Sequence, residues 1–221
     1  MALYRSMKKN LLVLLIICCS PISVSAQYDD SSLMMLELMR AASSYDHKLM
    51  EVMMPVLKDI RDMYDNGQYN DCIKAVDFTF DNVTFYKRNY YIYSWLHYYR
   101  GMSYLQLNYD ETGLANLVSA KDEQNEEAFK ALQQYFMKHM EEAVKNLSNG
   151  YYSNCVNHIN WAKKTTLYNY QLYEVEGRAL EGMNRFDEAK KSFRLAKKHG
   201  SPYAQELLKQ LKVHKKEYMK K

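Results

Sequence analysis

The stretch YEVEGRALEGMNRFDEAKKSFRLAKKHGSP, residues 173–202, decides the fold of this 221-residue chain. Gly177 sits among helix-forming residues, and Asn184 marks a turn seven residues later. After this turn, small and aromatic residues recur at spacings of three and four, which places them on one face of a helix: Ala189, Phe193 and Ala196. Pro202 then ends the pattern. The stretch therefore predicts two short helices joined by a tight turn.

This pattern resembles the tetratricopeptide repeat, a helix–turn–helix unit of 34 residues. Gly177 stands at position 8 of that unit, where the family has a small residue. The same frame fits three earlier parts of the chain, with position 8 at Ile60, Gly101 and Ala143. These positions are 41, 42 and 34 residues apart along the chain. The first two joints therefore carry about seven or eight extra residues beyond the repeat length, near 84–93 and 125–135.

A short phrase occurs twice at matching places in the frame, as DNGQYNDC at 65–72 and as SNGYYSNC at 148–155. Both copies read N-G-x-Y-x-x-C. The glycine can take the left-handed backbone conformation that closes the first helix, and the tyrosine then tucks under the hairpin. The cysteine falls where the second helix crosses the first. We therefore expect Cys72 and Cys155 to be buried thiols, held too far apart for a disulfide by an intervening unit.

Residues 1–26 are typical of a secretory signal of bacterial type. A basic start precedes the nine-residue apolar run Leu11–Cys19, and Val24-Ser25-Ala26 precedes Gln27. The run is shorter than the roughly 20 apolar residues of a spanning helix, and no second long apolar run follows. We expect an exported protein, periplasmic or extracellular. A lipoprotein anchor at Cys18 is disfavoured because Ile17, not a small residue, precedes it.

The predicted fold class is all-α, a right-handed α-solenoid of about four such hairpins with helical caps at both ends. Only 7 Gly and 3 Pro interrupt the chain, which favours helix. Residues 27–52 are expected to form an N-terminal capping helix, 53–203 the repeats and 204–221 a basic C-terminal helix. Pro55 is expected to open the helix after the first cap. Caps are needed because a terminal repeat exposes its stacking face.

The charge is nearly balanced overall but unevenly distributed. Removing residues 1–26 takes away three of the 30 basic residues and none of the 26 acidic ones, which leaves a net charge of +1. This balance does not indicate nucleic acid as a partner. Residues 185–221 carry a net +8, whereas 27–184 carry −7. The chain therefore ends on a strongly basic segment.

No catalytic motif was found in the sequence, which contains no H-E-x-x-H, G-x-S-x-G, phosphate loop or dinucleotide glycine triplet. We predict neither an enzyme nor a bound cofactor. A zinc site at Cys155-x-x-His158 would lack a second ligand pair. Methionines between Met34 and Met63 lie among Leu and Val at helical spacing, which favours a flexible core over copper ligands. His97 and His139 share repeat position 4, a core position, and are interpreted as packing residues.

The resemblance implies a concave groove lined by positions 2, 5, 9 and 12 of each first helix, where relatives bind peptides or proteins. Carried over residue by residue, the candidate binding residues are Arg61, Tyr64, Trp95, Tyr98, Met102, Glu174 and Arg178. The expected function is that of a non-catalytic adaptor or scaffold of the bacterial cell envelope. Trp95 and Tyr98 would anchor a protein or peptide partner. Alternatively, these two aromatics pack against the inserted segment 86–93.

Two further hypotheses remain open. The chain could be a structural or assembly subunit that contacts its partners through the solenoid ends. It could instead be held to anionic surfaces by its basic C-terminal helix, with peripheral membrane contact. In that helix, apolar residues recur at spacings that also suit a stacking face.

Overall fold

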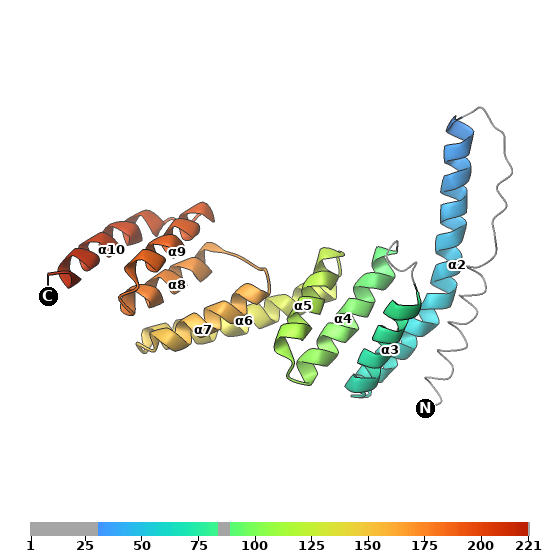
Figure 1. The fold of residues 1–221 in the computed structure, drawn as a ribbon, viewed down its shortest axis with the longest axis horizontal. Coiled ribbons are helices and arrows are strands. Elements are labelled where there is room, and N and C mark those ends of the chain that lie inside the picture. Colours follow the sequence, from blue (N-terminus) through green and yellow to red (C-terminus); the bar gives the residue numbers. More distant parts are fainter. Residues whose placement is uncertain (1–30, 84–88, 221) are drawn as a thin grey trace. The chain divides into compact units, whose positions relative to one another are not determined.

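The structure is a computed structural model that describes residues 31–83 and 89–220, with side chains described from residue 47 onward. Within these residues the chain is all-helical, with no strand. It divides into two compact units, at residue 126. The helices of the first unit are α2 (Ser31–Asp65), α3 (Tyr69–Asn82), α4 (Tyr90–Gln106) and α5 (Asp110–Asp122) (Figure 1). Those of the second are α6 (Glu126–Ser148), α7 (Tyr152–Lys164), α8 (Tyr170–Gly182), α9 (Phe186–Lys198) and α10 (Ala204–Tyr218). None of the described helices is both long enough and apolar enough to cross a membrane.

The prediction that a helix starts at Pro55 is wrong, because α2 continues through this residue. It runs without a break over 35 residues, with Pro55 inside it. An interior proline removes one backbone hydrogen bond and costs about 3 kcal/mol in a helix. Met53 and Val56 on either side of it are fully buried, whereas the proline itself faces solvent. Burial of these neighbours offsets the local cost, so the tertiary packing overrides the boundary that the sequence suggested.

The extra residues at the two long joints extend helices. Residues 126–135 form the first part of α6, which has 23 residues whereas α7, α8 and α9 have 13 each. At the earlier joint, residues 84–88 lie outside the described part, and residues 90–93 form the first turn of α4. Asn89 caps this turn, because its side-chain oxygen accepts the N–H of Ile92 at 3.1 Å.

The turns between paired helices share one geometry. Gly67 and Gly150 have φ of 71° and 76°, which confirms the left-handed conformation predicted for the repeated phrase. The residue after each glycine donates its N–H five residues back, from Gln68 to the carbonyl of Met63 and from Tyr151 to that of Asn146, both at 2.9 Å. The same left-handed conformation recurs at non-glycine turn residues: Asn108, Gln124, Thr166 and Asn184.

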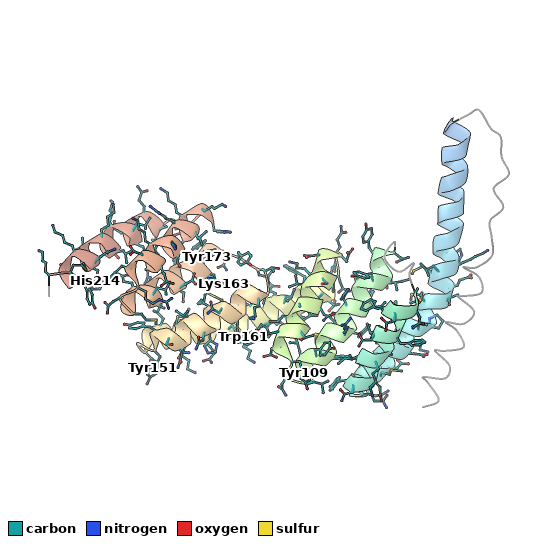
Figure 2. All side chains as sticks on the ribbon, viewed as in Figure 1. Tyr109, Tyr151, Trp161, Lys163, Tyr173 and His214 are labelled. Atoms are coloured by element: carbon teal, nitrogen blue, oxygen red, sulfur yellow. The ribbon has the colours of Figure 1, made fainter. Side chains whose placement is uncertain are left out.

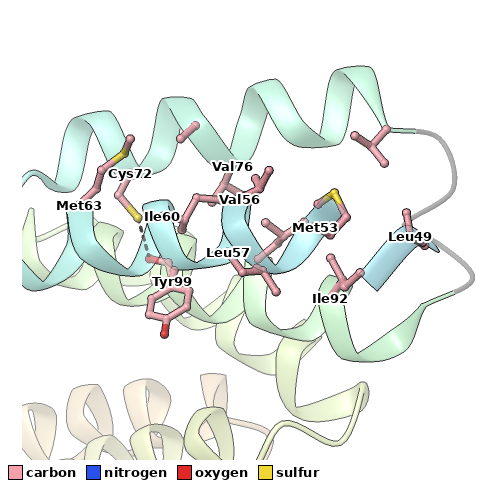
Figure 3. Packing of buried hydrophobic residues seen from close by; sticks show 13 residues of the cluster. Leu49, Met53, Val56, Leu57, Ile60, Met63, Cys72, Val76, Ile92 and Tyr99 are labelled. Atoms are coloured by element: carbon pink, nitrogen blue, oxygen red, sulfur yellow. Dashed lines mark hydrogen bonds between the residues drawn. The ribbon is translucent and has the colours of Figure 1, made fainter. Parts of the chain in front are cut away.

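In the first unit, apolar side chains from α2, α3 and α4 form one core (Figure 3). Its fully buried members include Met53, Ile60, Cys72, Val76 and Leu96. The Cys72 thiol points into this core and lies 3.9 Å from the carbonyl oxygen of Tyr99. As predicted, Cys72 and its repeat counterpart in α7 are both buried and unpaired.

Helices cross closely at small residues. A Cβ placed on Gly101 of α4 would lie 2.9 Å from the carbonyl oxygen of Gly113 in α5. A Cβ placed on Gly177 of α8 would overlap the ring of Phe193 in α9, which is fully buried. At these crossings, backbone or side-chain atoms of the facing helix fill the space that a larger residue would need.

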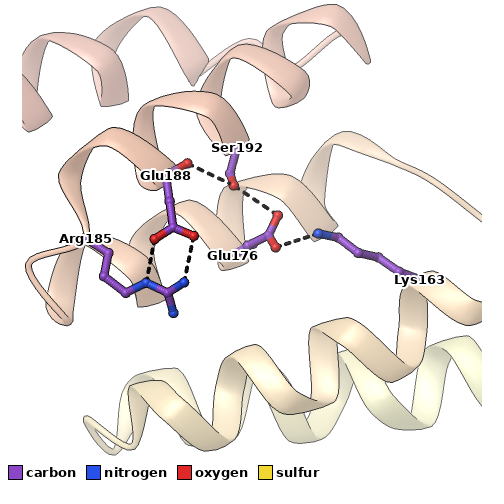
Figure 4. Close-up of polar contacts among 5 residues, drawn as sticks. All are labelled: Lys163, Glu176, Arg185, Glu188 and Ser192. Atoms are coloured by element: carbon purple, nitrogen blue, oxygen red, sulfur yellow. Dashed lines mark hydrogen bonds and ion pairs between the residues drawn. The ribbon is translucent and has the colours of Figure 1, made fainter.

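In the second unit, a buried carboxylate joins three helices. Glu176 of α8 is 8% exposed, and its Oε1 accepts a hydrogen bond from Lys163 Nζ of α7 at 2.5 Å (Figure 4). Its Oε2 accepts one from Ser192 Oγ of α9 at 3.0 Å. Nearby, Arg185 donates two hydrogen bonds to Glu188, at 2.7 and 2.6 Å, but both side chains are about half exposed. Of these two ion pairs, that of Glu176 is the less exposed, at 10% for its own side chain and 30% for that of Lys163.

We predict that Glu176→Gln lowers the free energy of unfolding by about 1–2 kcal/mol, because the amide cannot neutralise Lys163 in a largely buried position. The matched substitution Glu188→Gln removes an exposed ion pair of good geometry and should have a clearly smaller effect. Urea unfolding followed by circular dichroism at 222 nm measures both. Equal losses in the two variants would contradict a structural role for the buried carboxylate.

Candidate functional site

An open groove of about 740 Å³ lies between α2 and α4 in the first unit. Helix α4 supplies one wall through aromatic side chains, and α2 supplies the other through apolar residues with charged residues along it. The lining residues are Glu51, Met54, Pro55, Leu57, Lys58, Arg61, Tyr91, Trp95 and Tyr99. A concave surface that is mainly apolar and has a few charged groups is the usual form of a binding site.

The aromatic wall is a ladder of rings along α4. Tyr91, Trp95 and Tyr99 are spaced four residues apart, so they lie on one helix face. The Trp95 ring stacks on that of Tyr99, with centroids 5.6 Å apart and planes 27° apart. Tyr91 meets Trp95 edge-on at 6.3 Å, and Tyr98 does so at 5.3 Å. Because the rings pack on one another, their side chains would lose little conformational entropy when a ligand binds.

The α2 wall carries charges of opposite sign at its two ends. Glu51 lies about 15 Å along the helix from Arg61, at a rise of about 1.5 Å per residue, and Lys58 is one turn before Arg61. Arg61 Nε is 3.7 Å from Asp65 Oδ2, but both side chains are more than half exposed. Such a surface ion pair is weak, so a ligand carboxylate could compete for the guanidinium. The groove is therefore basic at one end.

The structure brings some of the predicted site residues together. Arg61 and Trp95 both line the groove. Tyr98 contacts Trp95 without lining it, and Tyr64 is half-buried, with its ring 5.9 Å from that of Tyr99. Burial raises the pKa of the Tyr64 hydroxyl. Met102 is half-buried on α4. In the first unit the predicted site thus has two residues in the groove and others beside it.

Two predicted residues belong to the second unit. Glu174 accepts a hydrogen bond from Ser201 Oγ, and that hydroxyl also accepts the N–H of Ala204 at 2.9 Å, at the start of α10. Glu174 thus supports the connection between α9 and α10. Arg178 is exposed and lines a separate hollow of about 490 Å³, in which Glu181 lies 2.9 Å from His214. Neither residue lies in the unit that contains the aromatic groove.

Sequence reasoning missed several groove residues, above all Tyr91 and Tyr99. The first was assigned to an insertion and the second fell at a position outside the expected face. Their spacing of four on either side of Trp95 was the available signal. The two interpretations of Trp95 turn out to be compatible. Its side chain is half-buried against Tyr91, from the inserted segment, and still lines the groove.

The surroundings of the buried cysteines and of His97 indicate that these side chains serve in packing. Burial raises the pKa of Cys72 and of Cys155 to about 11, so neither is a ready nucleophile. His97 Nδ1 lies 3.0 Å from Asn116 Oδ1, between aromatic rings, and burial lowers the pKa of its imidazole. Across residues 47–83 and 89–220, no cluster of three or more His, Cys, Asp or Glu side chains is arranged to hold a metal ion.

Comparisons with protein-family models, with curated proteins and with solved structures gave no match to this chain. The function of the groove is therefore argued from its own residues.

We predict that the two buried thiols are protected from alkylation at pH 8. A thiol with a pKa of about 11 is roughly 100-fold less ionised at this pH than an ordinary one, and burial further restricts access. Iodoacetamide labelling mapped by mass spectrometry should modify Cys72 and Cys155 at least about 100-fold more slowly in the native chain than in denaturant. Rapid labelling of either thiol in the native chain would contradict its burial.

Proposed function

We propose that this chain is a non-catalytic adaptor or scaffold that binds a protein or peptide segment in the groove between α2 and α4. The observation that carries the proposal is the aromatic ladder facing an apolar wall, with Lys58 and Arg61 at one end. Trp, Tyr and Arg are the residues that most often dominate binding energy at interfaces. Trp95 and Tyr91 would supply contact area for the ligand, and Tyr99, which is only 8% exposed, would support the Trp95 ring. Arg61 would orient the bound segment.

The proposal includes a finer description of the fold, namely a right-handed α-solenoid of four tetratricopeptide-like hairpins followed by α10 as a cap. It is supported by the shared turn geometry and by the close helix crossings at Gly101 and Gly177. In such an array the first helices of successive hairpins lie side by side, as α2 and α4 do in the first unit. The groove is the space between these two first helices.

The dimensions of the groove suggest the size and charge of its ligand. About 15 Å separates Glu51 from Arg61 along α2, which an extended peptide spans with about four or five residues. An apolar or aromatic side chain would lie against Trp95, and an acidic group would lie toward Lys58 and Arg61. We therefore propose a short apolar segment with an acidic residue at one end.

The cellular setting of the proposal rests on the sequence alone, because residues 1–26 lie outside the described residues. Their signal-like composition supports a role in the cell envelope, in the periplasm or outside the cell.

A specific observation favours a second candidate, an assembly role for the C-terminal end. Helix α10 packs on α9 through Leu207 and Leu211, but Val213, Tyr218 and Met219 are 58%, 50% and 75% exposed. These apolar side chains stand among lysines of the basic segment. A partner, or an anionic surface, could dock on this helix instead of in the groove.

The groove proposal predicts that peptides selected from a random displayed library on the immobilised chain will be apolar with an acidic residue. Fluorescence anisotropy would then measure affinity for wild type, Trp95→Ala and Met54→Arg. Loss of the indole should weaken binding about tenfold or more. Met54 is 44% exposed on the groove wall, so an arginine there obstructs the groove without disturbing the core.

Tyr151→Ala is the matched control, because Tyr151 is a 61% exposed aromatic residue of the second unit. It should leave affinity unchanged, and circular dichroism should show equal helicity in every variant. Peptides that bind both groove variants as tightly as wild type would contradict the proposed site. Loss of that binding on truncation before α10 would then support the second candidate.

A further inference from the structure

Two histidines face each other across the α6–α7 hairpin. His139 of α6 and His158 of α7 are both half-buried, and their Nδ1 atoms are 3.0 Å apart. Their ring centroids are 5.2 Å apart, close to the largest separation that this nitrogen distance allows. The two nitrogens therefore point at each other and not at a common third point. This is the geometry of an N–H···N hydrogen bond, not of two ligands converging on a metal ion.

The number of protons on the pair decides whether this bond exists. When both rings are neutral, one Nδ1–H donates to the lone pair of the other Nδ1. A single added proton leaves this bond in place, because an imidazolium still donates to a neutral imidazole. A second proton removes the only acceptor and places two positive charges about 3 Å apart. The two sites are therefore coupled, and the doubly protonated pair favours separated helices.

The first unit contains the same arrangement with one change. His97 of α4 and Asn116 of α5 are also 19 residues apart and form a 3.0 Å contact at the equivalent repeat positions. Asn116 Nδ2 donates to the carbonyl of Thr112 at 2.9 Å, which turns Oδ1 toward the imidazole. An amide oxygen accepts from both imidazole and imidazolium. The asparagine version of the pair therefore keeps its hydrogen bond after protonation, whereas the histidine version loses it.

Aromatic rings and a lysine lie around the histidine pair. The His139 ring packs against Tyr135, at 4.5 Å between centroids, and stacks near Trp161 at 6.2 Å. Lys164 Nζ lies 5.0 Å from the centre of the Trp161 ring, which adds positive charge from α7 (Trp161 is labelled in Figure 2).

Three carboxylates lie near the hairpin. Glu142, one turn along α6 from His139, lies 3.5 Å from Lys145, and Glu176 of α8 is held by Lys163. Glu141, the other acid near His139 on α6, is exposed to solvent. Tyr173 of α8 faces Lys163, whose Nζ is 5.8 Å from its ring centre. Two of the three carboxylates near the hairpin are therefore already engaged by lysines.

We propose that the His139–His158 pair is an acid-sensitive contact that holds α6 against α7 near neutral pH and loosens this hairpin below about pH 6. The open hairpin binds more protons than the closed one, so its stability falls as the pH falls. Helix α6 begins at the boundary between the two units. Acid would therefore loosen α6, the helix at which the chain passes from the first unit into the second.

Amide hydrogen exchange of the full chain at pH 7.5 and 5.5, corrected for intrinsic exchange rates, tests this proposal. In wild type, protection of α6 and α7 should fall about tenfold or more relative to α8 and α9. Burial also lowers the pKa of His97, which makes the first unit less stable as the pH falls below about 6.5. The comparison is therefore made within the second unit.

His158→Asn is the deciding variant, because it recreates the pair that the first unit already accommodates. It should clearly reduce the acid-dependent loss of protection in α6 and α7, because the amide oxygen still accepts a hydrogen bond from a protonated His139. An equal loss in the variant, or no loss in wild type, would overturn the proposal.

A measurement on the wild type alone covers the case in which that variant does not fold. NMR should detect the N–H···N hydrogen bond between the two Nδ1 atoms at pH 7.5, as a coupling across the bond, and should not detect it at pH 5.5. A coupling of equal size at both pH values, or none at pH 7.5, would also overturn the proposal.

Discussion

The structure depends on how closely two helices can approach where they cross. Within the hairpins, a small residue occupies the crossing: Gly101 faces Gly113, and Gly177 faces Phe193. Cys72 and Cys155 are fully buried at the corresponding place in their own hairpins. A larger side chain at these points would push the helices apart and leave the neighbouring core residues underpacked. The tight left-handed turns at Gly67 and Gly150 then follow, because helices this close need a short connection.

Close pairing within a hairpin has a consequence for the surface. Because α3 packs under α2 and α4, the first helices of two successive hairpins lie next to each other and leave a groove between them. The groove wall is then determined by residues four apart on α4, which are Tyr91, Trp95 and Tyr99. The three rings pack on one another, and those of Trp95 and Tyr99 also pack on the core, so residues that stabilise the unit also present a preorganised binding surface. Stability and the proposed function thus rest on one cluster.

Sequence reasoning predicted those features that depend on local chemistry. The helical class, the glycine turns and the buried cysteines all follow from residue type and spacing. It failed where distant residues decide the outcome. The helix passes through Pro55 because its neighbours are buried in a core that the local pattern does not reveal. Glu174 was assigned to a groove, although its partner Ser201 lies 27 residues away.

Sequence reasoning was limited in the same way at the groove and at the histidine pair, because both depend on residues that are distant in sequence. Arg61 and Trp95 were predicted from the repeat frame and line the groove, whereas Tyr99 was missed because it falls outside the face that the frame indicates. His139 and His158 were each interpreted separately, as a packing residue and as half of an unsupported zinc motif. Only the register between α6 and α7 shows that they meet. Pairings across helices depend on this register, which depends in turn on the crossings.

The most direct test of this account is the stability of Gly177→Ala beside Gly182→Ala, measured by urea unfolding. Alanine normally stabilises a helix relative to glycine by up to about 1 kcal/mol. At Gly177 the added methyl overlaps the fully buried Phe193 ring, so the account predicts a net loss of about 1–3 kcal/mol. At Gly182 the obstructing Tyr152 ring is half-buried and can swing toward solvent, so little change is expected. A Gly177→Ala variant as stable as wild type would contradict the claim that close crossings at small residues hold the fold together.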